Sequence, residues 1–386
     1  MVPSGAPGEA AAVKRDLIYF SPIPWRGLYQ RPQHTASFLA QRRRVLFVEP
    51  RTLHAPAPPP DQETLSFLAL PVIPSNARQP FLRRAARAAA ALSPLRALVE
   101  ARQVARLRRK ADALGLSSPI LLYAHPEFFA LRRLFPGAPL AYDHMDDILG
   151  FGDPPPALRE NLERLMGEAA WVNATSLSLG EQARRLGARR LLAIGNGVEW
   201  DRFAAAAAAG PEPAELAGLP RPRILYAGSV AEWLDLDLLF AVARRLPAMA
   251  FPVIGPVRPG LAKALRAAPG NVRFFGAKPY AEVPAWLAHS QAALIPFRIS
   301  PLTAAVDPVK IYEYLAAGLP VLATPFSPEI RALAPAVLLA DDAEGFAAGL
   351  VRVLAAPPDP AGQRAAAALR RWDRLLSELD SALDSL

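Results

Sequence analysis

Lys310 and Glu313 lie one helical turn apart and are the residues whose types and spacing point most directly to chemistry. They follow Pro308, which is expected to open a helix because the first N–H groups of a helix have no intrahelical partner. Free N–H groups and a lysine favour an anion at that end, and Glu313 on the same side of the helix could accept hydrogen bonds from two hydroxyl groups. The pattern predicts a site for a nucleotide diphosphate and its ribose; the alternative is an ordinary solvated pair on an amphipathic helix.

Several residues earlier in the second half of the chain would complete such a site. Gly228 and Ser229 end a predicted strand, and a glycine there lets the backbone approach a phosphate closely. Gly255 ends the next predicted strand, at the presumed cleft. Tyr280 could border the nucleotide base or pack in front of a helix, and Thr303, in a later loop, could meet the sugar or the diphosphate. We therefore add these five residues to the candidate nucleotide site.

Polar residues after predicted strands in the first half of the chain are candidates for acid–base chemistry. Asp143 and Asp146 follow one such strand, and in open parallel sheets the ligand crevice lies beyond the carboxyl ends of the strands. A carboxylate in a partly dry cleft can have a pKa high enough to take a proton from an attacking hydroxyl group. Asp146 is the first candidate and Asp143 the second, although either could cap the following segment. His34 could orient or deprotonate an acceptor or be purely structural, and Arg31 and His125 are assigned to the face that meets the acceptor or a membrane.

Most of the positive charge of the chain lies in residues 81–110, which hold nine basic residues and one acid. One face of a predicted helix there carries Arg102, Arg106, Arg109 and Lys110. This face could be an ordinary solvated surface, or it could rest on anionic lipid headgroups, which attract each nearby cation by about 1 kcal/mol. Nucleic acid is ranked below these two partners, because no recognised nucleic-acid module surrounds the patch and no aromatic residues alternate with its arginines.

The composition limits the classes of protein to which this chain can belong. Its 386 residues are enough for two domains of ordinary size, and no run of eighteen apolar residues predicts a spanning helix. The start of the chain lacks the apolar centre of a secretory signal, and the absence of cysteine excludes disulfides and thiol-ligated metals. Five scattered histidines give no H-x-x-x-H pair, so we expect no metal site. These features favour a cytoplasmic protein that can lie peripherally on the inner face of the plasma membrane.

Short apolar segments alternate with amphipathic ones along the chain, which predicts an α/β fold with parallel sheets. The expected strands lie at 16–21, 45–48, 119–124, 139–142, 171–176 and 191–194 in the first half, and at 223–229, 251–256, 272–276, 292–297 and 321–323 in the second. The dinucleotide fingerprint G-x-G-x-x-G is absent after the first strand. Residues 51–80 are rich in proline and are expected to be irregular. Helices are predicted at about 80–93 and 95–113, divided by Pro94, and from about Gln363 to Leu386.

Five longer motifs are spread along the chain. They are W-x-x-x-x-Q-R-P-Q-H from Trp25, Y-D-x-x-D-D-x-x-x-F from Tyr142, I-x-N-G-V-x-x-x-x-F from Ile194, Y-A-G-S-x-x-x-W-L-D-L-D-L-L from Tyr226 and P-x-K-x-Y-E-Y-L-A-A-G-x-P-V-x-A-T from Pro308. Together they resemble the GT-B glycosyltransferases, particularly family 4 and the bacterial polysaccharide enzymes similar to the teichuronic acid glycosyltransferases. In that family the glutamate of the last motif contacts the nucleotide ribose, and it matches Glu313. Many members carry a second acid eight residues earlier, where this chain has Ala305, with Asp307 nearby but out of register.

The resemblance implies a GT-B fold, in which two Rossmann-like domains face a cleft. The expected organisation is an acceptor-binding domain at 1–203, a linker at 204–222, a nucleotide-sugar-binding domain at 223–360 and a helix at 361–386 that packs back on the first domain. The implied reaction moves a sugar from a UDP- or GDP-sugar to a hydroxyl group of a lipid-linked saccharide in cell-surface polysaccharide biosynthesis, with neither a cofactor nor a metal. A sugar-nucleotide epimerase, an inactive protein that binds the donor, and a basic nucleic-acid-binding protein remain alternatives.

Overall fold

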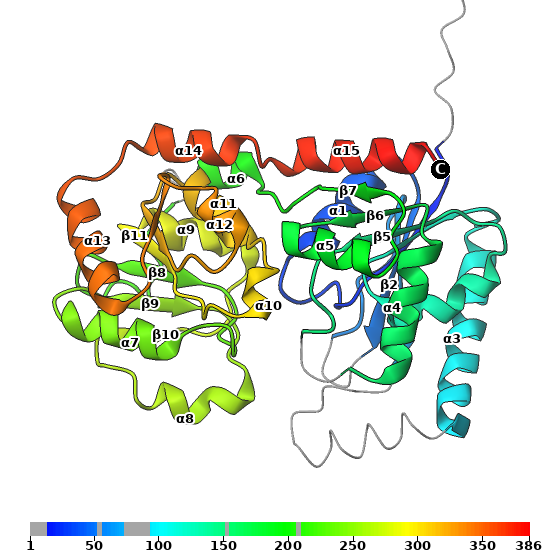
Figure 1. The fold of residues 1–386 in the computed structure, drawn as a ribbon, viewed down its shortest axis with the longest axis horizontal. Coiled ribbons are helices and arrows are strands. Elements are labelled where there is room, and N and C mark those ends of the chain that lie inside the picture. Colours follow the sequence, from blue (N-terminus) through cyan, green and yellow to red (C-terminus); the bar gives the residue numbers. More distant parts are fainter. Residues whose placement is uncertain (1–13, 52–55, 73–92, 151–153, 206–209) are drawn as a thin grey trace, which may run out of the picture.

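The computed structural model describes residues 14–51, 56–72, 93–150, 154–205 and 210–386. Two parallel sheets lie side by side, each covered by helices, and form two lobes (Figure 1). We call the lobe built on strands β1 to β7 the N-lobe and the lobe built on strands β8 to β13 the C-lobe. This arrangement confirms the predicted α/β fold with two parallel sheets.

The N-lobe sheet has the strand order β3-β2-β1-β4-β5-β6-β7 and is buried on both faces. Its strands are β1 (Leu17–Phe20), β2 (Val45–Arg51), β3 (Leu65–Pro71), β4 (Ile120–Tyr123), β5 (Leu140–His144), β6 (Trp171–Ala174) and β7 (Leu191–Leu192). Its helices are α1 (Arg31–Ala40), α3 (Ser93–Ala113), η1 (Pro126–Leu134), α4 (Pro156–Glu168), α5 (Leu177–Arg185) and the C-terminal α15 (Trp372–Asp384). Alternate residues of β1 face opposite layers: Leu17 and Tyr19 share a core with α1 and α15, and Ile18 and Phe20 share one with α3, η1 and α4.

The C-lobe sheet has the strand order β10-β9-β8-β11-β12-β13. Its strands are β8 (Ile224–Ala227), β9 (Phe251–Ile254), β10 (Val272–Phe274), β11 (Ala292–Ile295), β12 (Val321–Ala323) and β13 (Val337–Leu339). Its helices are α6 (Trp200–Ala204), α7 (Leu236–Arg245), η3 (Pro259–Leu261), α8 (Ala262–Leu265), η4 (Tyr280–Glu282), α9 (Val283–Ala288), α10 (Pro301–Ala304), α11 (Val309–Ala316), α12 (Pro328–Arg331), α13 (Ala343–Ala355) and α14 (Pro360–Ala368). In both sheets the carboxyl ends of the parallel strands lead into loops between the lobes, so the topology places these loops at one shared cleft.

Two strands occur where none was predicted. β3 lies within the region expected to be irregular, and it pairs with β2 from Leu65 opposite Val45 to Pro71 opposite Arg51. β13 has three residues and pairs with β12. Both are edge strands, which need only one neighbour and tolerate proline, so the local sequence gives a weaker signal than it does for a central strand.

Pro94 lies in the first turn of α3, whose described residues begin at Ser93. A proline is compatible with that position because the first N–H groups of a helix have no intrahelical partner to lose. The other predicted helix, at about 80–93, lies almost entirely outside the described residues.

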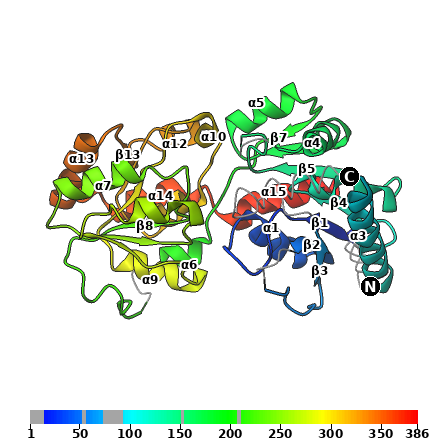
Figure 2. The same ribbon diagram turned by 90° about the horizontal axis from the view of Figure 1, so that it is seen from below.

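The C-terminal segment forms two helices instead of the single helix expected from Gln363. α14 packs against α11 in the C-lobe, and α15 packs beside α1 in the N-lobe (Figures 1 and 2). Between them the chain forms a parallel bridge with the segment around Val198, which leads from the N-lobe to the C-lobe. The Trp372 N–H donates to the Val198 carbonyl at 3.1 Å, and the Val198 N–H donates to the Arg370 carbonyl at 2.8 Å. The expected return of the chain to the N-lobe is confirmed, and this pairing explains why the helix is interrupted.

The chain passes from the N-lobe to the C-lobe before the predicted linker at 204–222. Val198, Phe203 and Leu216 are fully buried in the core of the C-lobe. The crossing therefore lies at the Ile194–Gly197 end of the I-x-N-G-V motif, and residue 198 already belongs to the C-lobe core.

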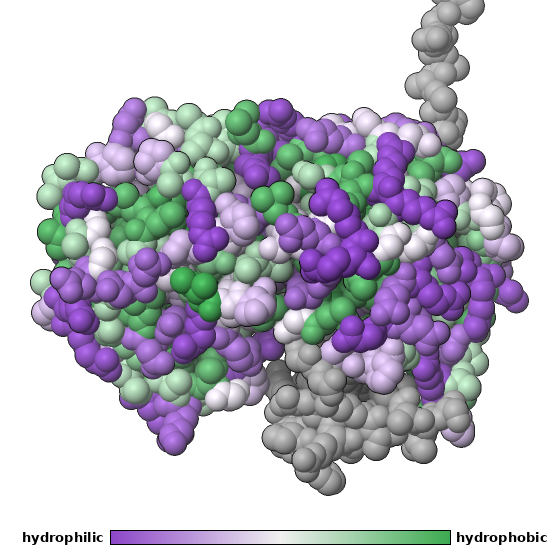
Figure 3. Space-filling view, viewed as in Figure 1, coloured by the Kyte–Doolittle hydropathy of each residue, from purple (hydrophilic) through white to green (hydrophobic). Residues whose placement is uncertain are grey.

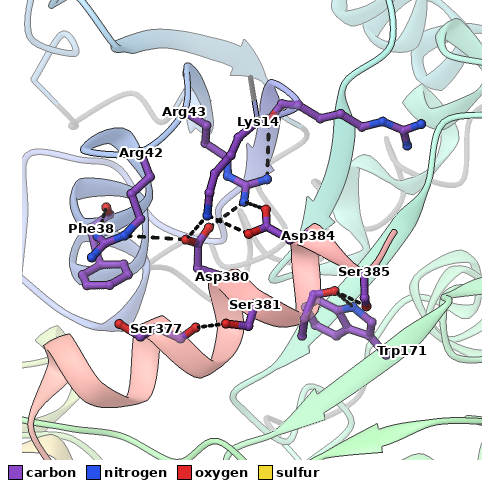
Figure 4. Close-up of polar contacts among 12 residues, drawn as sticks. Lys14, Phe38, Arg42, Arg43, Trp171, Ser377, Asp380, Ser381, Asp384 and Ser385 are labelled. Carbon is purple, nitrogen blue, oxygen red and sulfur yellow. Dashed lines mark hydrogen bonds and ion pairs between the residues drawn. The ribbon is translucent and has the colours of Figure 1, made fainter. Parts of the chain in front are cut away.

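Two acidic residues near the end of α15 hold this helix on the N-lobe (Figure 4). Asp380, 4% exposed, pairs with Arg43 at 2.5 Å and with Lys14 at 2.6 Å. Asp384 pairs with the same two cations at 2.6 and 2.7 Å. Because the side chain of Arg43 is itself buried, its charge depends on these carboxylates for compensation.

We expect Asp380→Ala to lower the free energy of unfolding by about 3 kcal/mol, because it leaves the buried Arg43 with one carboxylate instead of two. Urea unfolding followed by circular dichroism measures this change. The matched control is Glu378→Ala on the same helix, whose pair with Arg374 is long, at 3.9 Å, and half exposed, so a change within about 0.5 kcal/mol is expected. Equal effects of the two substitutions would contradict the role given to Asp380.

Candidate functional site

A cleft of about 610 Å³ opens between the two lobes. The C-lobe lines it with the loops after β8, β9, β10 and β11 and with the start of α11, and the N-lobe lines it with residues 27–31, Met145 and Asp146. All eight residues predicted for the nucleotide site line this cleft: Gly228, Ser229, Gly255, Tyr280, Thr303, Pro308, Lys310 and Glu313. Of the residues predicted for the acceptor side, Asp146 and Arg31 line it as well.

Lys310 lies in the first turn of α11, two residues after the N-cap residue Pro308. Its ammonium group lies 4.9 Å from the ring centre of Tyr226 and 4.8 Å from that of Phe297, and it donates to the Tyr226 hydroxyl at 3.3 Å. Burial lowers the pKa of Lys310 to about 8. A cation held against two aromatic faces next to free helix N–H groups forms a strong site for an anion.

Glu313 is one turn further along α11 and is 7% exposed. One of its carboxylate oxygens accepts a hydrogen bond from the Tyr280 hydroxyl at 3.0 Å. Burial raises the pKa of Glu313 to about 7, so the carboxylate is readily stabilised by additional hydroxyl donors. Lys310 and Glu313 thus face the same cleft, and their surroundings differ from those of an exposed ion pair.

Two glycines allow the strand ends to approach the lysine and each other. Gly228 has φ +156°, and a Cβ atom on it would lie 2.3 Å from the Lys310 ammonium nitrogen. Gly255 has φ +138°, and a Cβ atom there would lie 2.0 Å from the Gly228 carbonyl oxygen. Any side chain at either position would displace the backbone or the cation, so the wall of the cleft requires glycine at both.

Two tyrosines fix the end of β8 relative to α11. The Tyr314 hydroxyl accepts a hydrogen bond from the Ala227 N–H at 2.7 Å and donates to the Ala227 carbonyl at 3.1 Å. The Tyr226 hydroxyl donates to the Ser229 carbonyl at 2.9 Å. The backbone around Ser229 is therefore positioned by the helix that carries Lys310.

Thr303 is fully buried, and its hydroxyl group is used within its own loop. It donates to the Arg298 carbonyl at 2.5 Å and forms a capping box with Ser300. Ala305, two residues later, is 5% exposed and packs against Ala174 and Leu179 of the N-lobe. An apolar contact between the lobes thus occupies the position at which the resemblance described above would lead us to expect an acid.

Asp143 and Arg31 form a buried ion pair and not a free acid–base group. The guanidinium of Arg31 donates to the two carboxylate oxygens of Asp143 at 2.8 and 3.0 Å, and the Asn173 side chain donates to Asp143 at 2.8 Å. Arg31 is 2% exposed and also donates to the Gly195 carbonyl at 2.7 Å. Asp143 therefore has a structural role, and Arg31 is excluded from any membrane-facing surface.

Asp146 is the one acidic side chain among the described N-lobe residues that line the cleft. It lies in the loop after β5 and is half-buried. Burial, reinforced by the neighbouring Asp143 and Asp147, raises the pKa of Asp146 to about 7. A carboxylate with that pKa can accept a proton near neutral pH, as required of a general base.

The structure does not place the two predicted histidines at the cleft. His34 is 5% exposed, and its ring stacks on that of Trp372 with 4.8 Å between the ring centres. Burial lowers the pKa of His34 to about 3. His125 caps η1 by accepting a hydrogen bond from the Glu127 N–H at 3.2 Å, and burial lowers its pKa to about 4. Neither imidazole is among the residues that line the cleft, which favours the structural alternative for His34 and a structural role for His125.

The basic residues predicted on one face of α3 divide between two environments. Arg102 and Arg109 are exposed, whereas Arg106 is half-buried and Lys110 pairs with Asp61. The exposed side of the helix also presents two leucines, Leu95 at 38% and Leu98 at 46% exposure. Hydrophilic side chains gather over this part of the N-lobe in the view of Figure 3.

Sequence reasoning missed a buried cluster centred on Asp307. The carboxylate of Asp307, 3% exposed, accepts hydrogen bonds from the Asn196 N–H at 2.7 Å and the Tyr312 hydroxyl at 2.5 Å. The Asn196 side chain donates to the Asp307 carbonyl at 2.5 Å, and burial raises the pKa of the Asp307 carboxyl to about 6. The Asn-Gly pair of the I-x-N-G-V motif is typical of a local turn, and nothing in its spacing indicates a partner 111 residues away.

Among the described residues, no group of three or more histidine, aspartate or glutamate side chains is arranged to hold a metal ion.

Comparison with known sequences finds two partial matches. Residues 221–356 match the family described as glycosyl transferases group 1. A stretch of 142 residues is 30% identical to the putative teichuronic acid biosynthesis glycosyltransferase TuaH of Bacillus subtilis (strain 168), covering 36% of this chain and 35% of that protein. The match therefore spans about a third of the relative's length.

Solved structures resemble the whole chain in fold. Sucrose-phosphate synthase from Thermosynechococcus elongatus superposes with a TM-score of 0.68 at 16% identity, over 96% of this chain and 98% of that one. Anabaena HepE in complex with UDP and glucose superposes with a TM-score of 0.67 at 14% identity, over 96% and 100% of the two chains. An α,α-trehalose-phosphate synthase from Burkholderia vietnamiensis gives 0.68 at 15% identity, over 97% and 100%. The chain therefore has the GT-B fold, and residues 221–356 of its C-lobe are similar to the group 1 glycosyltransferases.

Proposed function

We propose that this chain transfers a sugar from a nucleotide-sugar donor to a hydroxyl group of a saccharide acceptor. The observation that carries the proposal is the convergence of Lys310 and Glu313, from one helix, on a cleft whose opposite lobe presents Asp146. The C-lobe would hold the donor and the N-lobe the acceptor. A thermal-shift panel of nucleotides and nucleotide sugars tests this directly, because a ligand that binds the folded state raises its apparent stability.

The donor half of the site would recognise a nucleoside diphosphate. Lys310 and the free N–H groups at the start of α11 would meet the diphosphate charge, with the backbone at Gly228 and Ser229 against it. Glu313 would accept hydrogen bonds from the ribose hydroxyls. We choose UDP as the first probe because the similarly folded HepE was solved with UDP and with UDP-glucose.

The acceptor half would use Asp146 as the general base. The acceptor hydroxyl oxygen forms a bond to the anomeric carbon of the sugar as the bond from that carbon to the diphosphate oxygen breaks. The hydroxyl proton passes to Asp146, and the departing diphosphate keeps the electron pair and is stabilised by Lys310. In this assignment Lys310 and the helix N–H groups stabilise the negative charge of the leaving group. We therefore propose that the transfer needs no metal.

We expect the affinity for UDP to be greatest between about pH 7 and pH 8. Glu313, with its pKa raised to about 7, gains a proton as the pH falls below 7 and loses its capacity to accept from both ribose hydroxyls. Lys310, with its pKa lowered to about 8, loses its charge as the pH rises above 8. Isothermal titration calorimetry with UDP from pH 5.5 to 9.5 measures the profile.

Two substitutions test which residue causes the loss of UDP affinity at low pH and which causes it at high pH. Glu313→Gln is expected to weaken UDP binding about ten-fold. It should also reduce the loss of affinity at low pH to the part that comes from protonation of the UDP phosphate, whose pKa is about 6. Lys310→Met is expected to remove the loss of UDP affinity at high pH. Glu344→Gln, an exposed residue of α13, is the control and should leave both losses of affinity unchanged. Wild-type affinity in Glu313→Gln would remove this residue from the nucleotide site.

We expect Asp146→Asn to reduce sugar transfer about a hundred-fold or more while changing the Kd for UDP less than two-fold. The amide keeps the shape of the side chain but cannot take the proton. Release of UDP from UDP-glucose and other UDP-sugars, with and without a panel of saccharide acceptors, measures the loss, and Asp341→Asn is the exposed control. Full transfer by Asp146→Asn would exclude it as the base, and conversion of the free donor to its epimer without an acceptor would instead favour an epimerase.

We further propose that the exposed face of α3 rests on an anionic membrane, which would bring a lipid-linked acceptor to the cleft. Leu95, Leu98, Arg102 and Arg109 recur on one side of the helix, so two apolar side chains and two cations point outward together. Apolar residues flanked by arginines suit the headgroup region of a bilayer. None of the helices in the described part of the chain is long and apolar enough to cross a membrane.

For the double variant Arg102→Glu/Arg109→Glu we expect binding to phosphatidylglycerol vesicles to weaken by about thirty-fold or more, since each cation contributes about 1 kcal/mol. Vesicle sedimentation measures the binding. The control Arg244→Glu/Arg245→Glu makes the same change in net charge on α7 of the C-lobe, where both arginines are exposed. Equal losses in the two variants would show that net charge, and not this face of α3, governs binding.

A further inference from the structure

Tyr280 joins the two lobes across one rim of the cleft. Its ring, at the start of η4 in the C-lobe, lies against the ring of Tyr29, in the N-lobe loop before α1. The ring centres are 5.1 Å apart and the planes differ by 19°, which is a stacked arrangement. Both residues line the cleft, so this contact lies beside the proposed donor.

The Tyr280 hydroxyl is hydrogen-bonded to Glu313, the carboxylate on which the proposed nucleotide site depends. It donates to Glu313 at 3.0 Å, and Glu313 is 7% exposed. A ribose hydroxyl is a donor of the same kind and needs the same acceptor. The Tyr280 phenol therefore lies on the carboxylate that the proposed site assigns to a ribose hydroxyl.

We propose that Tyr280 is a positioning residue that competes with the donor nucleotide for Glu313 and transmits the outcome to the N-lobe through Tyr29. This inference rests on the proposed function. When a ribose hydroxyl replaces the phenol on Glu313, the Tyr280 ring loses the hydrogen bond that holds it against Tyr29. Donor binding thus exchanges a contact between the lobes for a contact with substrate.

The partners of Tyr29 provide the next step toward the N-lobe. Tyr29 meets His34 edge to face at 4.6 Å, and its hydroxyl shares a hydrogen bond with that of Ser37 on α1 at 3.2 Å. His34 in turn stacks on Trp372, the first residue of α15, at 4.8 Å. Because α15 follows directly on the return crossing between the lobes, a change at Tyr280 reaches a segment that governs how the lobes meet.

The arrangement makes a prediction about the sign of a mutational effect. A ligand shifts an equilibrium between two arrangements only by its difference in affinity for them, so a competing internal contact reduces its apparent affinity. Tyr280→Phe removes the phenol oxygen and keeps the ring. We expect it to tighten UDP binding about five-fold, the factor that corresponds to one net hydrogen bond.

Stability separates this competition from a direct contact of Tyr280 with the nucleotide. Without UDP, Tyr280→Phe is expected to melt below wild type, because Glu313 has lost its donor. With saturating UDP the two proteins are expected to melt together. Calorimetric titration measures the affinity and thermal melting measures the stability, each with UDP and in parallel with GDP. The control is Tyr123→Phe, at a buried tyrosine whose hydroxyl has no hydrogen-bond partner among the described residues. It should match wild type in both affinity and melting temperature.

A double-mutant cycle tests the connection to the N-lobe. Tyr29→Leu, which removes the stacking partner, is expected to tighten UDP binding as well, because Tyr280 is then held on Glu313 less firmly. In the double variant Tyr29→Leu/Tyr280→Phe the affinity is expected to equal that of Tyr280→Phe alone, since the competing bond is already absent. An affinity gain equal to the product of the two single gains would show independent action and would overturn the role of Tyr29.

The outcomes also separate this inference from the proposal on which it rests. If the wild type binds UDP or GDP and Tyr280→Phe binds it equally or more weakly, the competition is overturned and the proposed function stands. If the wild type binds neither nucleotide, the proposed function fails and the competition fails with it.

Discussion

The buried carboxylate of Asp307 fixes how the two lobes meet. It accepts hydrogen bonds from the Asn196 backbone, in the crossing segment, and from Tyr312 on α11. Unpaired, a buried charge is costly, so the crossing segment and the start of α11 are held in register by their shared partner. Gly195 leaves room for this arrangement, because a Cβ atom there would lie 2.7 Å from an Asp307 carboxylate oxygen. Lys310 follows three residues later, and its position in the cleft therefore depends on a contact between the lobes.

The lobes are connected by two covalent crossings that run side by side, and by contacts at the rims of the cleft. Val198 and Trp372 pair through their backbones where the outgoing and returning segments meet. At one rim the Ser176 hydroxyl of the N-lobe donates to the Ala305 carbonyl of the C-lobe at 2.8 Å. At another rim Tyr29 and Tyr280 stack. This distribution allows a nucleotide to alter one rim contact while the paired crossings keep the lobes aligned, as catalysis between two lobes requires.

Local sequence patterns were sufficient for the central strands and for the cleft-facing helix, but not for features defined by distant partners. The apolar runs predicted every central strand, and the lysine–glutamate spacing on α11 predicted two residues that share the cleft. The edge strands β3 and β13 escaped because a strand with one neighbour carries a weak pattern. The sequence made Asp143 a candidate base, but the structure pairs it with Arg31, which lies 112 residues away in the sequence. The surroundings of His34 and His125 could not be predicted from the sequence, because burial, which lowers their pKa, is a property of the folded chain.

A crystal structure of the protein with UDP tests the central claim most directly. The account predicts the diphosphate at the start of α11, within hydrogen-bond distance of the Lys310 ammonium group, and the ribose hydroxyls on the carboxylate of Glu313. Nucleotide bound elsewhere, or bound in the cleft with Lys310 and Glu313 turned away from it, would contradict the assignment of this helix as the donor site.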